Sequence, residues 1–114
     1  MINDQRSSPR HDFPYQQLVA MVADGKMPAS SDFHTVPCEN VSRGGIAFFL
    51  NEEPTAQEYV VALGPAWNLS YLCARVAHTR RAIYDGKLWY RVACRFTGRA
   101  SFDHSTLTVV RMGE

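Results

Sequence analysis

Residues 88–96 read LWYRVACRF, and this stretch decides the fold class. Apolar side chains occupy every second position from Leu88 to Phe96, which is the period of a β-strand and not of a helix. We expect one face of this strand to enter a core and the other to be solvated or functional. The core positions are Leu88, Tyr90, Val92, Cys94 and Phe96.

The turn YDGK at residues 84–87 predicts a hairpin, because Asp-Gly is a favoured pair for a two-residue β-turn. With that turn alone, Val76 would lie opposite Arg95, and the apolar residues of the two strands would fall on opposite faces of the sheet. We therefore expect an odd-length connection or a β-bulge, either of which brings Val76 opposite Cys94 or Phe96.

Short apolar runs bounded by Gly, Pro and polar clusters predict further strands earlier in the chain. A helix is the alternative for the first run, and residues 26–33 are expected to form a loop. The spacing is typical of an all-β domain. The expected strands are Tyr15–Ala23, Thr35–Asn40, Ile46–Leu50 and Glu58–Leu63.

The two ends of the chain differ from its middle. Residues 1–14 are polar and hold two prolines, which predicts an N-terminal arm before a single domain at residues 15–114. In the tail, a short helix could begin at Ser101 or Asp103, although the Thr and Val content of residues 101–112 disfavours a helix. The side chains of that helix facing the domain would be Phe102, Leu107 and Val110.

Composition indicates a small globular protein. The 114 residues are 46% hydrophobic and carry a net charge of +1, and no apolar run approaches the roughly 18 residues that span a bilayer. We expect a cytoplasmic protein without membrane insertion. The cysteines are Cys38, Cys73 and Cys94; they are far apart in apolar segments, so we expect buried thiols and neither disulfides nor a metal site.

The basic residues are mostly arginine, and only Lys26 and Lys87 are lysines. Because a guanidinium binds phosphates and base edges through two parallel hydrogen bonds, this bias favours an anionic or planar ligand. A genome rich in G and C is the alternative cause.

Two short motifs carry the functional signal. Arg6 and Arg10 form an Arg-x-x-x-Arg pair, which about one place in a chain this rich in arginine would match by chance. Asn40, Ser42 and Gly45 fit Asp/Asn-x-Ser-x-x-Gly, a pattern expected only about 0.04 times in such a chain. The turn is therefore the stronger of the two signals.

Together these motifs resemble the PilZ domain family, in which RxxxR in an N-terminal arm precedes (D/N)xSxxG at the start of a strand. The resemblance extends to the IAFFL strand after the glycines and to the late VACRF strand. It implies a six-stranded antiparallel β-barrel that binds cyclic di-GMP, a bacterial second messenger. Arg6 and Arg10 would contact the ligand together with Asn40, Ser42 and Gly45.

The chemistry of cyclic di-GMP suits these residue types. Guanine offers the O6 and N7 acceptors that an Arg fork matches, and N1–H and N2–H donors that the Asn40 side-chain oxygen and the Ser42 hydroxyl can accept. Gly44 and Gly45 would supply a positive φ or a close backbone approach beside the ligand, although a plain reversing turn also favours glycine.

Three further positions adjoin the motifs. Gln5 stands where some PilZ domains have another Arg that favours a stacked ligand dimer, so ligand stoichiometry is open. Arg43 could reach a phosphate, but an exposed turn residue is the commoner outcome. Arg91 and Arg95 could extend a basic surface, with a solvated strand face as the alternative.

The sequence thus favours a cyclic di-GMP receptor whose arm becomes ordered on binding and which signals to a protein partner. The first alternative is a PilZ-like adaptor that binds no nucleotide. The second is an oligonucleotide-binding barrel, which the near-neutral charge disfavours, so no extended nucleic acid is expected. No acid/base or nucleophile arrangement is recognisable, and we expect neither an enzyme nor a bound cofactor.

Overall fold

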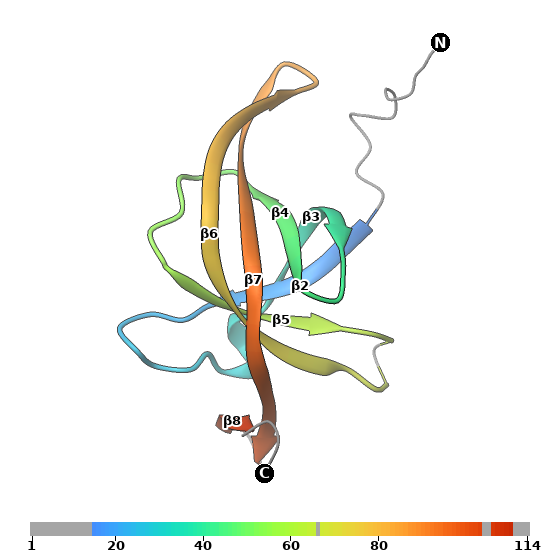
Figure 1. Cartoon of the computed structure of the whole chain (residues 1–114), viewed down its shortest axis with the longest axis vertical. Helices are drawn as coiled ribbons and strands as arrows, with labels where there is room; N and C mark the ends of the chain where they lie inside the picture. The colour runs from blue at the N-terminus through green and yellow to red at the C-terminus, as the bar shows by residue number, and fades with distance from the viewer. Residues whose placement is uncertain (1–14, 66, 104–105, 111–114) are drawn as a thin grey trace.

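A computed structural model of the chain describes residues 15–65, 67–103 and 106–110 (Figure 1). Antiparallel strands form a closed six-stranded barrel in the order β2-β3-β4-β7-β6-β5, with a seventh strand, β8, added to β7. The expected all-β, six-stranded antiparallel barrel is confirmed. The elements are β2 (Tyr15–Met21), the 3-10 turn η1 (Ser30–Asp32), β3 (His34–Val41), β4 (Gly45–Leu50), β5 (Glu58–Leu63), β6 (Ser70–Tyr84), β7 (Lys87–Asp103) and β8 (Thr106–Val110).

The barrel core comes from alternate residues of its strands, as the period of two requires. Phe48 is fully buried and packs edge-to-face on Tyr59, with ring centroids 5.2 Å apart. Cys38 and Cys94 are buried in the same cluster, whereas Cys73 is half-buried. The expectation of buried thiols therefore holds for Cys38 and Cys94 and only partly for Cys73.

The β6–β7 hairpin contains both the two-residue turn and the bulge that the sequence predicts. Asp85 and Gly86 have φ angles of 55° and 72° and join the paired residues Tyr84 and Lys87. Because Val76 pairs with Cys94 while His78 pairs with Ala93, the extra residue is Ala77. Of the two partners predicted for Val76, Cys94 and Phe96, the structure has Cys94.

The tip of this hairpin projects beyond the barrel, as the top of Figure 1 shows. The pairing of β4 with β7 ends where Leu50 meets Tyr90, so Leu88 lies past the last strand that could cover it. Leu88 is 41% exposed, and its expected place in the core was wrong. The alternating pattern identified the strand but not where its neighbour ends.

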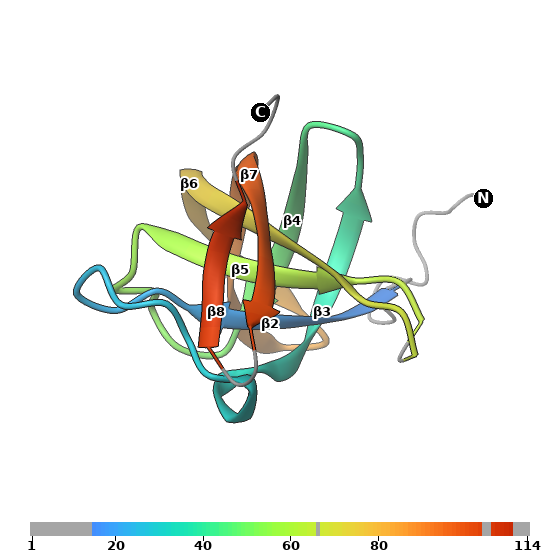
Figure 2. The same cartoon turned by 90° about the horizontal axis from the view of Figure 1, so that it is seen from below.

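The described part of the tail forms strands, and the possible short helix is not formed there. β7 continues to Asp103 and β8 pairs with its last residues, along the edge of β7 that β4 leaves free (Figure 2). Thr and Val favour this extended backbone. Leu107 is buried beside Val60 and Ala100. It therefore faces the domain as predicted, but it does so from a strand and not from a helix.

The first strand is shorter than expected. β2 ends at Met21, and Ala23 then bridges to Lys26 across a tight turn in which Asp24 and Gly25 have positive φ angles.

Among the described residues, no helix has the length and apolar character needed to cross a membrane.

Candidate functional site

The predicted Asn-x-Ser-x-x-Gly motif forms the β3–β4 hairpin. The Ser42 backbone N–H donates to the Gly45 carbonyl oxygen at 2.9 Å and closes the turn. The Ser42 hydroxyl is 3.4 Å from the same oxygen, a longer contact that the turn does not need. Arg43 and Gly44 form the exposed tip.

A β-bulge at Glu39 determines where Asn40 points. Cys38 pairs with Phe48 and faces the core, but Asn40 pairs with Ala47, which leaves Glu39 as the extra residue. In a regular strand, Asn40 would share the inward face of Cys38, two positions before it. The bulge therefore moves the Asn40 side chain to the outer face of the barrel.

The surface beside Asn40 is lined by small side chains. Asn40 pairs with Ala47, and Ala47 pairs with Ala93 on β7, so the three residues form one row on the outer face. Next to that row, Gly45 pairs with Arg95. Ala47 is only 4% exposed and Ala93 is half-buried, so a ligand would reach this row at the side of the exposed Asn40.

Gly45 is required by the fold itself. A Cβ atom built on Gly45 would overlap the backbone carbonyl oxygen of Cys94, while one on Gly44 would meet nothing within 4 Å. Neither glycine has a positive φ, and the Phe96 N–H donates to the Gly44 carbonyl oxygen at 2.9 Å. We expected a ligand to approach the backbone closely at Gly45. In the structure, the Cys94 carbonyl group of β7 makes that close approach.

The arginines around the hairpin differ in their partners. Arg91 Nε donates to Glu39 Oε1 at 2.6 Å, with the Arg91 side chain only 19% exposed, so Arg91 holds the bulged residue in place. Arg43 and Arg95 are exposed, and neither has an acidic partner among the described residues. These two cations remain available to an anionic ligand.

Cys38 supports the bulge from inside the barrel. Its thiol donates to the Asn40 carbonyl oxygen, with the sulfur 3.4 Å from that oxygen. Burial raises the pKa of Cys38 to about 11, so the thiol remains a neutral donor at physiological pH. This contact ties the backbone of Asn40 to the core.

Gln5, Arg6 and Arg10 lie outside the described residues. The start of β2 shows where the chain leaves the predicted arm, since Tyr15 pairs with Cys38. Cys38 is two positions before Asn40 in β3. The register thus brings residue 15 next to the strand that carries the motif hairpin.

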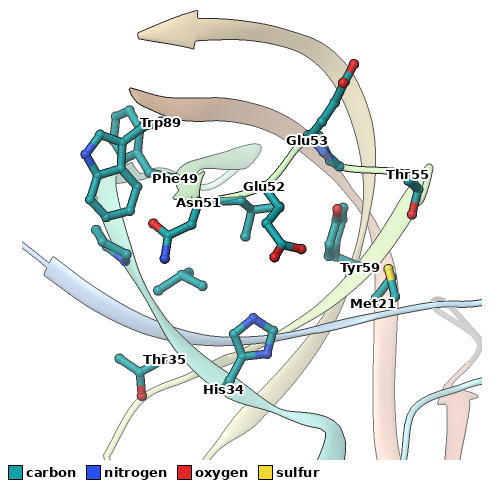
Figure 3. Close-up of a pocket in the computed structure, with 14 residues that line it drawn as sticks. Met21, His34, Thr35, Phe49, Asn51, Glu52, Glu53, Thr55, Tyr59 and Trp89 are labelled. Atoms are coloured by element: carbon teal, nitrogen blue, oxygen red, sulfur yellow. The ribbon is translucent and has the colours of Figure 1, made fainter. Parts of the chain in front are cut away.

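A separate pocket of about 470 Å³ lies at the opposite ends of β3 and β4 (Figure 3). His34 and Thr35 line it from β3, Tyr59 from β5 and Trp89 from β7. Burial raises the pKa of Tyr59 to about 12, which keeps that phenol protonated at neutral pH.

The described residues hold no cluster of three or more His, Cys, Asp or Glu suited to a metal ion.

Comparisons with protein-family models, with curated proteins and with solved structures found no match for this chain. Functional inference therefore depends on the site itself. The motif pointed to Asn40, Ser42 and Gly45, but it gave no sign of the bulge at Glu39. Arg95 carried only the general signal of a basic residue on the outer face of a strand.

Proposed function

We propose that this protein is a cytoplasmic PilZ-type receptor that binds cyclic di-GMP on the outer face of the β3–β4 hairpin. The observation that carries the proposal is the bulge at Glu39, which turns Asn40 outward. Asn40 then lies beside the small residues Ala47 and Ala93 and close to the turn that the motif Asn-x-Ser-x-x-Gly forms. The protein acts by binding and not by catalysis.

Each residue type has a distinct part in recognition. No described residue hydrogen-bonds the Asn40 side chain, so its amide oxygen can accept the N1–H or N2–H of guanine. Arg43 and Arg95 can neutralise phosphate charge. Arg6 and Arg10 complete the site from the arm, as the PilZ resemblance implies.

Ordering the arm makes binding a switch. Fixing the backbone costs about 1–2 kcal/mol per residue, so the ligand contacts must exceed that cost. The surface that the ordered arm presents then signals to a protein partner.

Calorimetric titration of wild-type protein with cyclic di-GMP tests the proposal. Ser42→Ala is the cleanest variant, since the backbone bond to Gly45 is retained and the fold should be unaffected. We expect Ser42→Ala, Asn40→Ala and Arg10→Ala each to weaken binding about tenfold, the value of one lost polar contact in a binding site. Ser70→Ala, exposed at the start of β6, is the matched control.

The proposal fails if the wild-type protein binds no cyclic di-GMP at tens of micromolar and moderate salt. Equal affinity of the Ser42→Ala and Ser70→Ala variants would move the site away from the hairpin. If the wild-type protein binds no cyclic di-GMP, the PilZ-like adaptor without nucleotide is the better description.

A further inference from the structure

The second half of β6 has one unpaired edge. β5 pairs with β6 only as far as Arg75, and the Val76 N–H then donates to the Gln57 carbonyl oxygen at 2.8 Å. From there to Tyr84, the only described strand that pairs with β6 is β7. A strand edge of this length is open to pairing with another chain.

The hairpin turn fixes which backbone groups lie on that edge. In a hairpin with a two-residue turn, the flanking pair, here Tyr84 and Lys87, is hydrogen-bonded, and hydrogen-bonded pairs alternate along the strand. Thr79, Arg81 and Ile83 therefore direct their N–H and C=O groups away from β7. These groups are spaced as an added strand requires.

A polar groove of about 430 Å³ runs beside the same edge. Thr79, Arg80 and Arg81 line it from β6, and Glu53 lines it from the loop between β4 and β5. Arg80 and Arg81 point to opposite faces of the sheet, as adjacent strand residues do. Both are exposed without an acidic partner among the described residues, so a strand in the groove would have a cation on each side.

These charges select the occupant. Pairing of two copies of this edge would bring Arg80 and Arg81 of each chain together, and like charges across strands are destabilising. A segment carrying carboxylates would instead pair with both arginines. Ile83 and Leu88, which are 65% and 41% exposed and directly paired, add an apolar contact at the tip.

We propose that the free edge of β6, residues 77–83, binds an extended acidic segment of a partner protein by β-strand addition. The backbone of Thr79, Arg81 and Ile83 supplies the hydrogen bonds, and the arginine side chains supply the charge selectivity. The site lies on a different strand edge from the β3–β4 hairpin, and its binding does not depend on a nucleotide.

The test uses a short end-capped peptide with two adjacent glutamates between β-branched residues, and a control peptide with glutamines in their place. Fluorescence anisotropy measures affinity for the full-length chain, and amide hydrogen exchange locates the contact. We expect the acidic peptide to bind more tightly, to lose affinity as salt rises, and to protect the amides of Thr79, Arg81 and Ile83 from exchange.

Two variants separate the backbone and charge contributions. Thr79→Pro removes one edge N–H without touching the ladder to β7 and should weaken binding about fivefold, while Thr79→Ala should not. Replacing both Arg80 and Arg81 by Gln should also cost about fivefold, from two exposed ion pairs, and remove the preference for glutamate. Thermal unfolding confirms that each variant is folded.

Three results would overturn the proposal. One is equal binding of the acidic and neutral peptides by wild-type protein. Another is protection located away from residues 77–83. The third is a concentration-dependent dimer in sedimentation that Thr79→Pro abolishes, because a second copy of the chain would then be the occupant.

Discussion

Substitution of Gly45 by alanine tests how the motif glycine contributes to the fold. The added Cβ would overlap the Cys94 carbonyl oxygen, so β4 and β7 must separate locally. Overpacking of this kind costs about 1–3 kcal/mol, and weakening the adjacent bond from the Phe96 N–H to the Gly44 carbonyl adds about 1 kcal/mol. We expect Gly45→Ala to lower the free energy of unfolding by about 2–4 kcal/mol, or roughly 10 °C in Tm.

The matched control is Gly44→Ala, one residue earlier. A Cβ there meets nothing within 4 Å and its φ is not positive, so stability should change by less than about 1 kcal/mol. Urea unfolding followed by tryptophan fluorescence measures both variants. Equal stabilities of the two alanine variants would refute the reasoning, and Gly45 would then serve ligand approach alone.

Two further predictions concern the core and the bulge. Burial raises the pKa of Cys38 to about 11 and of Cys94 to about 12 from an ordinary value of 9.0, so the folded state holds these protons more tightly than the unfolded state. The contribution of these two thiols to stability should therefore be constant below about pH 9 and fall as the pH rises toward 11, by at most about 1.4 kcal/mol per pH unit for each thiol. A Tm unchanged between pH 8 and 10.5 would contradict this. Arg91→Ala removes the partly buried bond to Glu39 and should cost about 1 kcal/mol in urea unfolding, whereas Arg75→Ala, whose contact with Glu58 is 3.6 Å long and exposed, should cost less than about 0.5 kcal/mol. Equal losses in the two variants would show that Arg91 does not anchor the bulge.

Local patterns were sufficient to predict most of the fold. The alternation at residues 88–96 identified a barrel strand. The mismatch between an Asp-Gly turn and the apolar face of Val76 predicted either an odd-length connection or a bulge, and the structure has a bulge at Ala77. Both inferences depend on neighbouring strands that the chain connects directly. Register within a hairpin follows from turn length and side-chain period alone.

Other features depend on contacts between distant segments. The need for Gly45 comes from the Cys94 carbonyl oxygen on β7, and the strand β8 uses an edge of β7 that is free because β4 begins at Gly45, opposite Arg95. The bulge at Glu39 is stabilised by Arg91, also on β7. None of these contacts leaves a trace in the sequence around the residue that it affects.

The central claim is that the outward face of the β3–β4 hairpin binds cyclic di-GMP. The most direct measurement is an NMR titration of isotopically labelled full-length protein with cyclic di-GMP, with GTP as the control ligand. We predict saturable shifts of the backbone amides of Asn40–Gly45 and Arg95 at tens of micromolar cyclic di-GMP, and much smaller shifts with GTP. The absence of shifts, or shifts confined to the pocket at His34 and Trp89, would contradict the claim.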